Sequence, residues 1–203
     1  MNYRIIVLNE AADFLFDLKK NRKKLGAKMI RVIDLLEHYG NQLRYPYTRK
    51  LKNSDIWELR AQHASDICRL FYFYHKDSVY VALCGYIKKE QKTKKNIIEK
   101  AVYRGRNIVK EYDFESIKQK MLEDKDFKKE YDALETEFTI AKELIGLRIK
   151  KNLTQQQLAV MTKTSQSAIA RLESGRYKTL TLSFLNRVAE AVGAKVELHL
   201  KAE

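Results

Sequence analysis

A chain of 203 residues has room for one large domain or two small ones, and its 45% apolar content is enough for packed cores, which argues against global disorder. The longest uncharged strand-like run, residues 78–87, is too short to cross a bilayer. The first ten residues lack the apolar core and cleavage site of a signal peptide. We therefore expect a cytoplasmic protein that makes no membrane contact.

The net charge of +14 is distributed in blocks along the chain. Residues 1–112 contain 24 Lys and Arg against 12 Asp and Glu, residues 113–143 contain 6 against 10, and residues 144–203 contain 10 against 4. Basic blocks suit polyanions, because they neutralise phosphates and release counterions. A solubilising lysine surface is the alternative, but two basic blocks around an acidic one favour nucleic acid.

Strand-like and helix-like patterns alternate in the first part of the chain. Residues 3–8 predict a strand, and Asn9 is placed to cap a helix that ends near residue 21. A second helix is predicted over residues 25–39, and Gly40 ends it. Strand patterns follow at residues 56–62, 67–74 and 78–87, and then come a lysine-rich loop and a helix over residues 93–103. We expect an α+β domain over residues 1–112, with an antiparallel sheet and helices to one side.

The two cysteines, Cys68 and Cys84, both fall in strand-like runs. Neither has metal-ligand spacing to another Cys or His, so we expect buried free thiols in a reducing compartment. A disulfide between neighbouring strands is the alternative.

Residues 113–138 form an acidic segment with amphipathic helical patterns. One apolar stripe contains Phe114, Ile117 and Met121, and a second begins at Phe127. Such a segment should dock on another surface. We interpret it as a helical connector for a basic partner surface; the alternative is the first helix of the following domain.

From residue 139 onward the chain predicts an all-α domain, residues 139–203, with helices near 140–151, 155–161, 166–173 and 181–192. Thr154 and Gln157 have the spacing of a capping box, and Ser165 caps the next helix. Gly175 and Gly193 end helices. The tail, residues 195–200, alternates like a strand and could contribute to a dimer.

A short helix, a tight turn and another short helix define the helix-turn-helix geometry, in which the second helix enters the major groove. Its exposed side chains can read base edges, and flanking cations can hold phosphates. A helical bundle without a DNA role is the alternative. The residues expected to contact DNA are Gln155, Lys163, Gln166, Ser167, Arg171, Arg176 and Lys178.

The segments 153–159 (LTQQQLA) and 169–175 (IARLESG) resemble the Cro/repressor (Xre) helix-turn-helix family over about 55 residues. The sequence departs from the family at Thr179-Leu180, where a proline is common, and this affects a loop only.

In the first domain, two arginines stand inside strand patterns among aromatic residues. They are Arg60, in the segment 56–60 (IWELR), and Arg69, in the segment 68–72 (CRLFY). Arginine offers a rigid fork that fits phosphate. The alternative is that each arginine pairs with Glu58 or Asp66 and braces the sheet.

These segments, together with residues 85–93 (GYIKKEQKT), resemble the RelE/HigB-type toxins, in particular the phage-related HigB branch, over nearly all of residues 1–110. Members of that family are endoribonucleases that cut messenger RNA on the ribosome, and their antitoxins are often Xre proteins encoded next to them. The resemblance implies a RelE-like sheet and metal-free chemistry without a cofactor, in which the RNA supplies its 2′-OH as nucleophile.

The resemblance also implies roles for particular side chains. Arg60 and Arg69 would stabilise charge on phosphorus, and a lysine could transfer protons if neighbouring cations lower its pKa. His63 is a further candidate for proton transfer, as are two tyrosines. The catalytic candidates are Arg60, Arg69, Lys88, Lys89 and Lys92, and the RNA-binding candidates are Lys50, Lys52, Tyr72 and Tyr86.

We interpret the whole chain as a HigBA-like toxin–antitoxin protein. Its expected partners are messenger RNA on the ribosome, operator DNA, its own toxin or antitoxin part within or between chains, and a second copy in a homodimer. Two alternatives stay open: a non-enzymatic helix-turn-helix regulator with a basic partner-binding domain, and a regulatory protein whose toxin domain no longer cuts.

Overall fold

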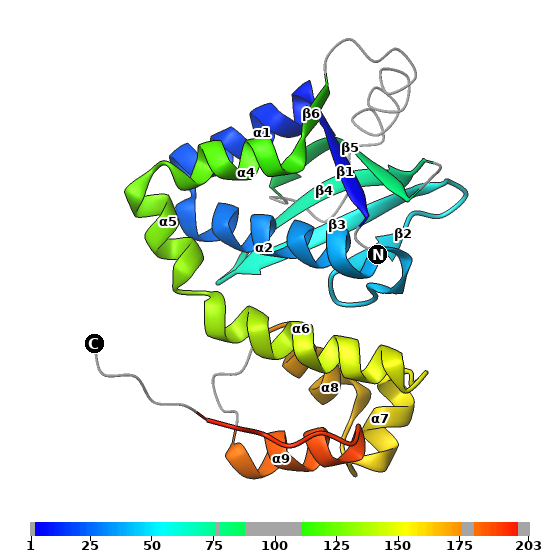
Figure 1. Cartoon of the computed structure of the whole chain (residues 1–203). Helices are drawn as coiled ribbons and strands as arrows, with labels where there is room; N and C mark the ends of the chain where they lie inside the picture. Colours follow the sequence, from blue (N-terminus) through cyan, green and yellow to red (C-terminus); the bar gives the residue numbers. More distant parts are fainter. Residues whose placement is uncertain (1–2, 76–77, 88–110, 176–180, 199–203) are drawn as a thin grey trace. The chain divides into compact units, whose positions relative to one another are not determined.

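The computed structural model describes residues 3–75, 78–87, 111–175 and 181–198. The chain divides into two compact units, residues 1–135 and residues 136–203 (Figure 1). The predicted fold class is confirmed, because the first unit is α+β and the second is helical. No helix in these ranges is long and apolar enough to cross a membrane.

A mixed sheet forms the centre of the first unit. Its strands are β1 (Arg4–Leu8), β2 (Thr48–Lys50), β3 (Ile56–His63), β4 (Asp66–Tyr74), β5 (Val79–Ile87) and β6 (Glu111–Asp113), in the order β2-β3-β4-β5-β1-β6. All neighbouring pairs are antiparallel except β1 and β5, which are parallel. The expectation of a purely antiparallel sheet was therefore wrong. Two helices separate β1 from β2, so no hairpin turn dictates the direction of β1.

Two helices, α1 (Asn9–Asn21) and α2 (Lys23–Tyr39), cover one face of this sheet, with α1 on β5 and α2 on β3. Asn9 was expected to cap α1, but the capping position belongs to Leu8, and no side chain caps the helix. Gly40 ends α2 with φ +51° and begins the short 3₁₀ helix η1 (Gly40–Gln42). An added Cβ there would lie 2.3 Å from the Tyr3 ring, so glycine fits this turn.

A further helical layer, formed by α4 (Phe114–Leu122) and α5 (Lys125–Asp132), packs on α1 and α2 (Figure 1). The expected apolar stripes supply its contact face: Phe114 and Ile117 are 1% exposed, and Met121 and Phe127 are fully buried. The structure thus places most of the acidic segment in the first unit.

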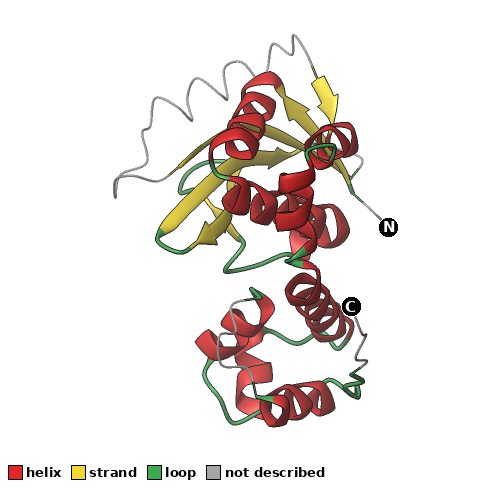
Figure 2. Ribbon diagram, turned by 90° about the vertical axis from the view of Figure 1, so that its left-hand side faces the viewer, coloured by secondary structure: helices red, strands yellow, loops and turns green. Residues whose placement is uncertain are grey.

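The second unit consists of α6 (Glu135–Lys150) from residue 136 onward, α7 (Gln155–Met161), α8 (Gln166–Glu173) and α9 (Leu182–Ala191), shown in red in Figure 2. Leu144, Leu158, Ile169 and Val188 are among its buried core residues. The expected capping box between Thr154 and Gln157 is present, and Ser165 and Thr181 cap the next two helices.

The strand expected in the tail is absent from the described residues 195–198, which have no regular secondary structure. Val196 packs against the helical core, and Leu198 is 65% exposed. The alternation that suggested a strand has no neighbouring strand to pair with among the described residues of this unit.

Candidate functional site

The two strand arginines lie directly opposite each other on one face of the sheet. Arg60 of β3 is the register partner of Arg69 of β4, and Arg69 is the partner of Tyr86 of β5. Because side chains alternate along a strand, Glu58, two residues before Arg60, shares this face. The other face is the one that the helices cover, because Leu59 pairs with Leu70 and Leu70 with Gly85, and an added Cβ on Gly85 would lie 2.1 Å from the Phe14 ring of α1.

Glu58 bridges the two arginines. Its Oε2 accepts a hydrogen bond from Nη1 of Arg69 at 2.6 Å, and its Oε1 lies 3.0 Å from Nε of Arg60. The Glu58 side chain is 3% exposed, Arg69 is 11% exposed and Arg60 is 25% exposed. One carboxylate therefore balances two guanidinium groups in a largely buried cluster.

The rest of this face is mainly apolar and aromatic. Ile56, Phe71 and Cys84 belong to one buried cluster, and Tyr86 packs against its edge. The rings of Phe71 and Tyr86 are 5.7 Å apart. Tyr86 is thus the predicted RNA-binding aromatic residue that the structure brings close to the arginine pair.

Sequence reasoning missed two residues on this face. Glu58 was considered as a structural partner only, and Arg49 was not considered. Arg49 is exposed and is the register partner of Glu58 across β2 and β3. The short strand β2 has no alternating pattern, so only the observed register reveals this placement.

Several predicted residues lie elsewhere. Tyr72 is 4% exposed on the helix side of the sheet, where burial raises its pKa. Lys50 alternates with Arg49, so it lies on the other face, and it pairs with Asp55 at 3.5 Å. Lys52 is exposed beyond β2, and His63 ends β3. The lysines predicted to take part in catalysis, Lys88, Lys89 and Lys92, lie outside the described residues.

Both cysteines are free and buried, as predicted. Cys84 is the register partner of Phe71, whereas Cys68 is the partner of Ile87, so the two thiols do not face each other. Burial raises the pKa of each thiol to about 12, which keeps them protonated and unreactive.

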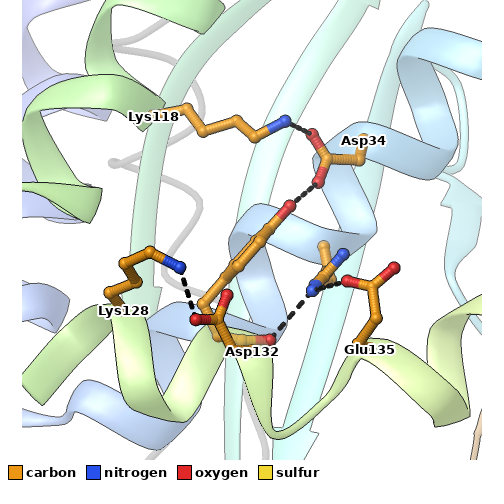
Figure 3. A network of polar contacts seen from close by, with 7 residues as sticks. Asp34, Lys118, Lys128, Asp132 and Glu135 are labelled. Carbon is orange, nitrogen blue, oxygen red and sulfur yellow. Dashed lines mark hydrogen bonds and ion pairs between the residues drawn. The ribbon is translucent and has the colours of Figure 1, made fainter.

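The layer of α4 and α5 is held to α2 by a polar network (Figure 3). Asp34 accepts hydrogen bonds from Lys118 Nζ at 2.8 Å and from Tyr131 Oη at 2.7 Å. Arg31 lies 3.5 Å from the centre of the Tyr131 ring, donates to the Tyr131 carbonyl at 3.0 Å and pairs with Glu135. Within α5, Lys128 pairs with Asp132.

A second set of charges joins the beginning of α2 to the beginning of α5. Lys23 Nζ lies 2.8 Å from Asp126 and 3.2 Å from Asp124. The hydrogen bond to Asp126 raises the pKa of Lys23, and the backbone N–H of Phe127 lowers the pKa of Asp124. Burial lowers the pKa of Lys118, but the hydrogen bond to Asp34 and the negative charges of Asp34, Glu115 and Glu37 together outweigh it, so the net pKa is raised. The pKa shifts of Lys23, Asp124 and Lys118 thus favour the charged form of each of these three side chains.

In the second unit a buried chain of polar side chains supports the predicted recognition helix α8. Gln166 donates to Gln155 Oε1 at 2.7 Å, and Gln155 donates to Glu173 at 2.9 Å. Arg148 of α6 holds Glu173 with two contacts, one of them at 3.0 Å, and donates to the Leu153 carbonyl. Gln155, 8% exposed, therefore braces Gln166.

The other predicted DNA contacts are distributed around the turn and α8. Lys163, Ser167 and Arg171 are exposed, and Lys163 has φ +50° in the turn between α7 and α8. The Ser167 hydroxyl bonds with that of Ser165 at 2.9 Å. The last two candidates, Arg176 and Lys178, lie outside the described residues.

Comparison with protein families gives two matches. Residues 14–106 match the family described as "Phage derived protein Gp49-like (DUF891)", and residues 145–198 match the family described as "Helix-turn-helix". No curated protein matches the chain. The first match contains Glu58, Arg60 and Arg69. The second match contains α7 and α8, and a helix-turn-helix domain implies DNA binding. The chain thus joins a Gp49-like domain of the RelE/toxin type to an Xre-type helix-turn-helix domain, which is the composition of a toxin–antitoxin fusion.

Proposed function

We propose that this chain is a toxin–antitoxin protein of the HigBA type. Its first domain is a ribosome-dependent messenger-RNA endoribonuclease, and its helix-turn-helix domain binds operator DNA and represses its own gene. The observation that carries this proposal is the pairing, in one chain, of a Gp49-like domain and a helix-turn-helix domain.

The chemistry that we propose needs no metal ion. The 2′-OH of the RNA attacks the neighbouring phosphorus and loses its proton, the 5′-oxygen of the next nucleotide leaves and gains one, and a 2′,3′-cyclic phosphate forms. Arg60, with Arg69 behind it, stabilises the additional negative charge on the phosphate oxygens. Tyr86 of β5 lies opposite Arg69 of β4, where its ring can stack on a base. Lys88, Lys89 and Lys92 follow directly in the sequence and stay our candidates for phosphate binding and proton transfer.

We further propose that residues 113–135 are the part of the antitoxin that holds the toxin. Their contacts with α2 combine buried aromatic anchors, a cation–π contact and ion pairs of complementary sign, as protein–protein interfaces do. They pack on the helical side of the sheet, and Glu58 and Arg60 face the other side. Restraint through this segment therefore acts on the helical layer rather than by covering the arginines.

Growth assays with three chain lengths test which part restrains the toxin. We expect residues 1–110 to arrest growth and the full chain to be tolerated. If α4 and α5 suffice for restraint, residues 1–135 are tolerated as well; if the second unit is needed, residues 1–135 arrest growth. Equal tolerance of all three, with the two fragments soluble and folded by circular dichroism, would contradict the proposed toxin.

A second candidate function is a non-enzymatic regulator whose basic first domain binds a partner. The observation that favours it is Glu58, which pairs with both arginines in the way that a structural brace would. Under this alternative the full chain binds DNA but no fragment cleaves RNA, so the growth assay separates the two functions.

A further inference from the structure

Glu58 is a charged residue in a place where charge is costly. Its side chain is 3% exposed, and on the same face it neighbours the buried apolar residues Ile56 and Phe71. Buried ionic clusters are often no more stable than apolar residues of the same volume. Stability alone therefore gives no reason for three charged side chains here, and such clusters are frequent at functional sites.

The two arginines differ in how much of each is free to bind. Arg69 is nearly buried and is tied to Glu58 through Nη1. Arg60 is more exposed, and Glu58 contacts it through Nε only. No described residue pairs with the two terminal nitrogens of Arg60. These nitrogens are two parallel donors, the arrangement that binds two oxygens of a phosphate at once.

A free arginine side chain has many rotamers, and holding it in one of them requires a partner. Glu58 Oε1 lies 3.0 Å from Arg60 Nε in an ion pair that lacks hydrogen-bond geometry, so it restricts the guanidinium through charge attraction. Among the described residues, none occupies the outer edge of that guanidinium. Arg69 fixes the carboxylate from the opposite side at 2.6 Å. The cluster keeps a formal charge of +1, so it still attracts a phosphate.

We propose that Glu58 is a positioning residue, which orients the outer edge of Arg60 toward a phosphate group of the RNA. The proposal rests on the proposed ribonuclease function, and it assigns Glu58 no contact with the substrate. Both carboxylate oxygens face arginines and the side chain is almost fully buried, so Glu58 does not take the proton from the 2′-OH. Its effect on the reaction passes through Arg60.

The test uses the full chain and the variant Glu58→Gln. The amide can still accept from Arg69 through its oxygen, but its NH₂ group would meet the N–H of Arg60, and two donors repel. The control is Asp66→Asn, the same carboxylate-to-amide change at the first residue of β4, in an exposed ion pair with Arg22. The probe is inorganic phosphate, followed through the Arg60 Nε–H signal in NMR spectra, with the backbone amide spectrum as the check of the fold.

We expect Glu58→Gln to weaken phosphate binding at Arg60 at least about 10-fold, while Asp66→Asn binds like the parent chain. The double variant Glu58→Gln/Arg69→Met removes one negative and one positive charge together, so the net charge of the buried cluster does not change. It replaces Glu58→Gln in the test if that single variant does not fold. The same loss is expected there, because Arg60 again lacks its carboxylate. Unchanged phosphate binding in either folded variant overturns the proposal.

Cleavage in a ribosome-containing extract separates this inference from the proposed function. In whichever form of the chain the parent cleaves, Glu58→Gln is compared in that same form. We expect the variant to lower kcat about 10- to 100-fold with little change in KM, because a misplaced Arg60 affects the transition state more than ribosome binding. Equal cleavage by parent and variant refutes the role of Glu58 and leaves the ribonuclease intact. If the parent chain binds phosphate but never cleaves RNA, and Glu58→Gln loses the phosphate binding, the ribonuclease is refuted and Arg60 remains an anion site that Glu58 positions.

Discussion

At the scale of single residues, the decisive feature is that each unit buries a carboxylate to hold an arginine or a glutamine in place. Glu58 does this in the first unit, and Glu173 does it in the second, between Arg148 and Gln155. In both cases the last side chain of the series is the one that we expect to touch nucleic acid. Removing an inner member should therefore affect stability and binding together, whereas removing the outer member should affect binding alone.

Arg69→Ala tests the inner position of the first unit. It leaves the Glu58 carboxylate buried with one partner fewer, so we expect the free energy of unfolding to fall by about 3–5 kcal/mol. Arg60→Ala, at the more exposed position, should cost much less stability. Urea denaturation of both variants measures the difference, and equal losses would contradict this assignment of inner and outer positions.

Gln155→Ala tests the brace of the recognition helix. Gln166 loses its acceptor at 2.7 Å and its side chain becomes mobile, while α8 itself keeps its Ser165 cap. We expect affinity for the chain's own promoter DNA to fall about 10-fold, which is within the range of one lost base contact. Binding is measured by fluorescence anisotropy at fixed salt, with Gln156→Ala, an exposed neighbour, as the control. Parent-like affinity would show that Gln166 needs no brace.

The reactivity of the two buried thiols tests whether the core of the first unit stays closed in the native chain. Because burial raises the pKa of Cys68 and Cys84 to about 12, thiolate is scarce at neutral pH, and we expect no reaction with a disulfide reagent until the unit unfolds. Spectrophotometric thiol titration with and without denaturant measures this. Fast labelling of the native chain would mean that the sheet opens locally.

At the scale of elements, the structure assigns the acidic segment to the first unit up to residue 135. Phe127 of α5 packs closely on α2, where an added Cβ on Gly26 would lie 3.1 Å from the Phe127 ring. This contact and the Asp34 and Arg31 contacts join the same two helices. The segment is therefore docked on α2 by both apolar and polar contacts.

Phe127→Ala should remove most of that docking. We expect a loss of about 3–5 kcal/mol in the unfolding free energy of the first unit, from lost burial and the cavity left behind. Lys129→Ala, on the exposed side of the same helix, is the control and should change stability by less than about 0.5 kcal/mol. If both variants unfold alike, α5 is only loosely attached.

Much of this architecture could be predicted from the sequence because it depends on local rules. The helix-turn-helix caps at Thr154 and Ser165 and the strand alternation around Glu58, Leu59 and Arg60 depend on a few neighbouring residues, and all were found. Other features depend on residues distant in the chain. The parallel pairing of β1 with β5, the short strands β2 and β6, and the sharing of Glu58 by two arginines follow from tertiary register, which no local pattern encodes.

At the scale of the whole molecule, two domains share one chain. In the function that we propose, covalent linkage keeps the toxin and its restraint at a fixed ratio and a high effective concentration, so an interface of moderate strength is sufficient. The network around Asp34 and Arg31 needs only to keep residues 113–135 on α2, since this segment and the first domain belong to one chain and cannot diffuse apart.

The most direct test of the central claim is cleavage of messenger RNA in a ribosome-containing translation extract, comparing residues 1–110, residues 1–135 and the full chain, each with Arg60→Ala as the inactive control. We predict that at least residues 1–110 cleave, that Arg60→Ala abolishes the cleavage, and that the full chain cleaves far less. Absence of cleavage by every folded form would contradict the ribonuclease, and the chain would then be a DNA-binding regulator with a basic partner-binding domain.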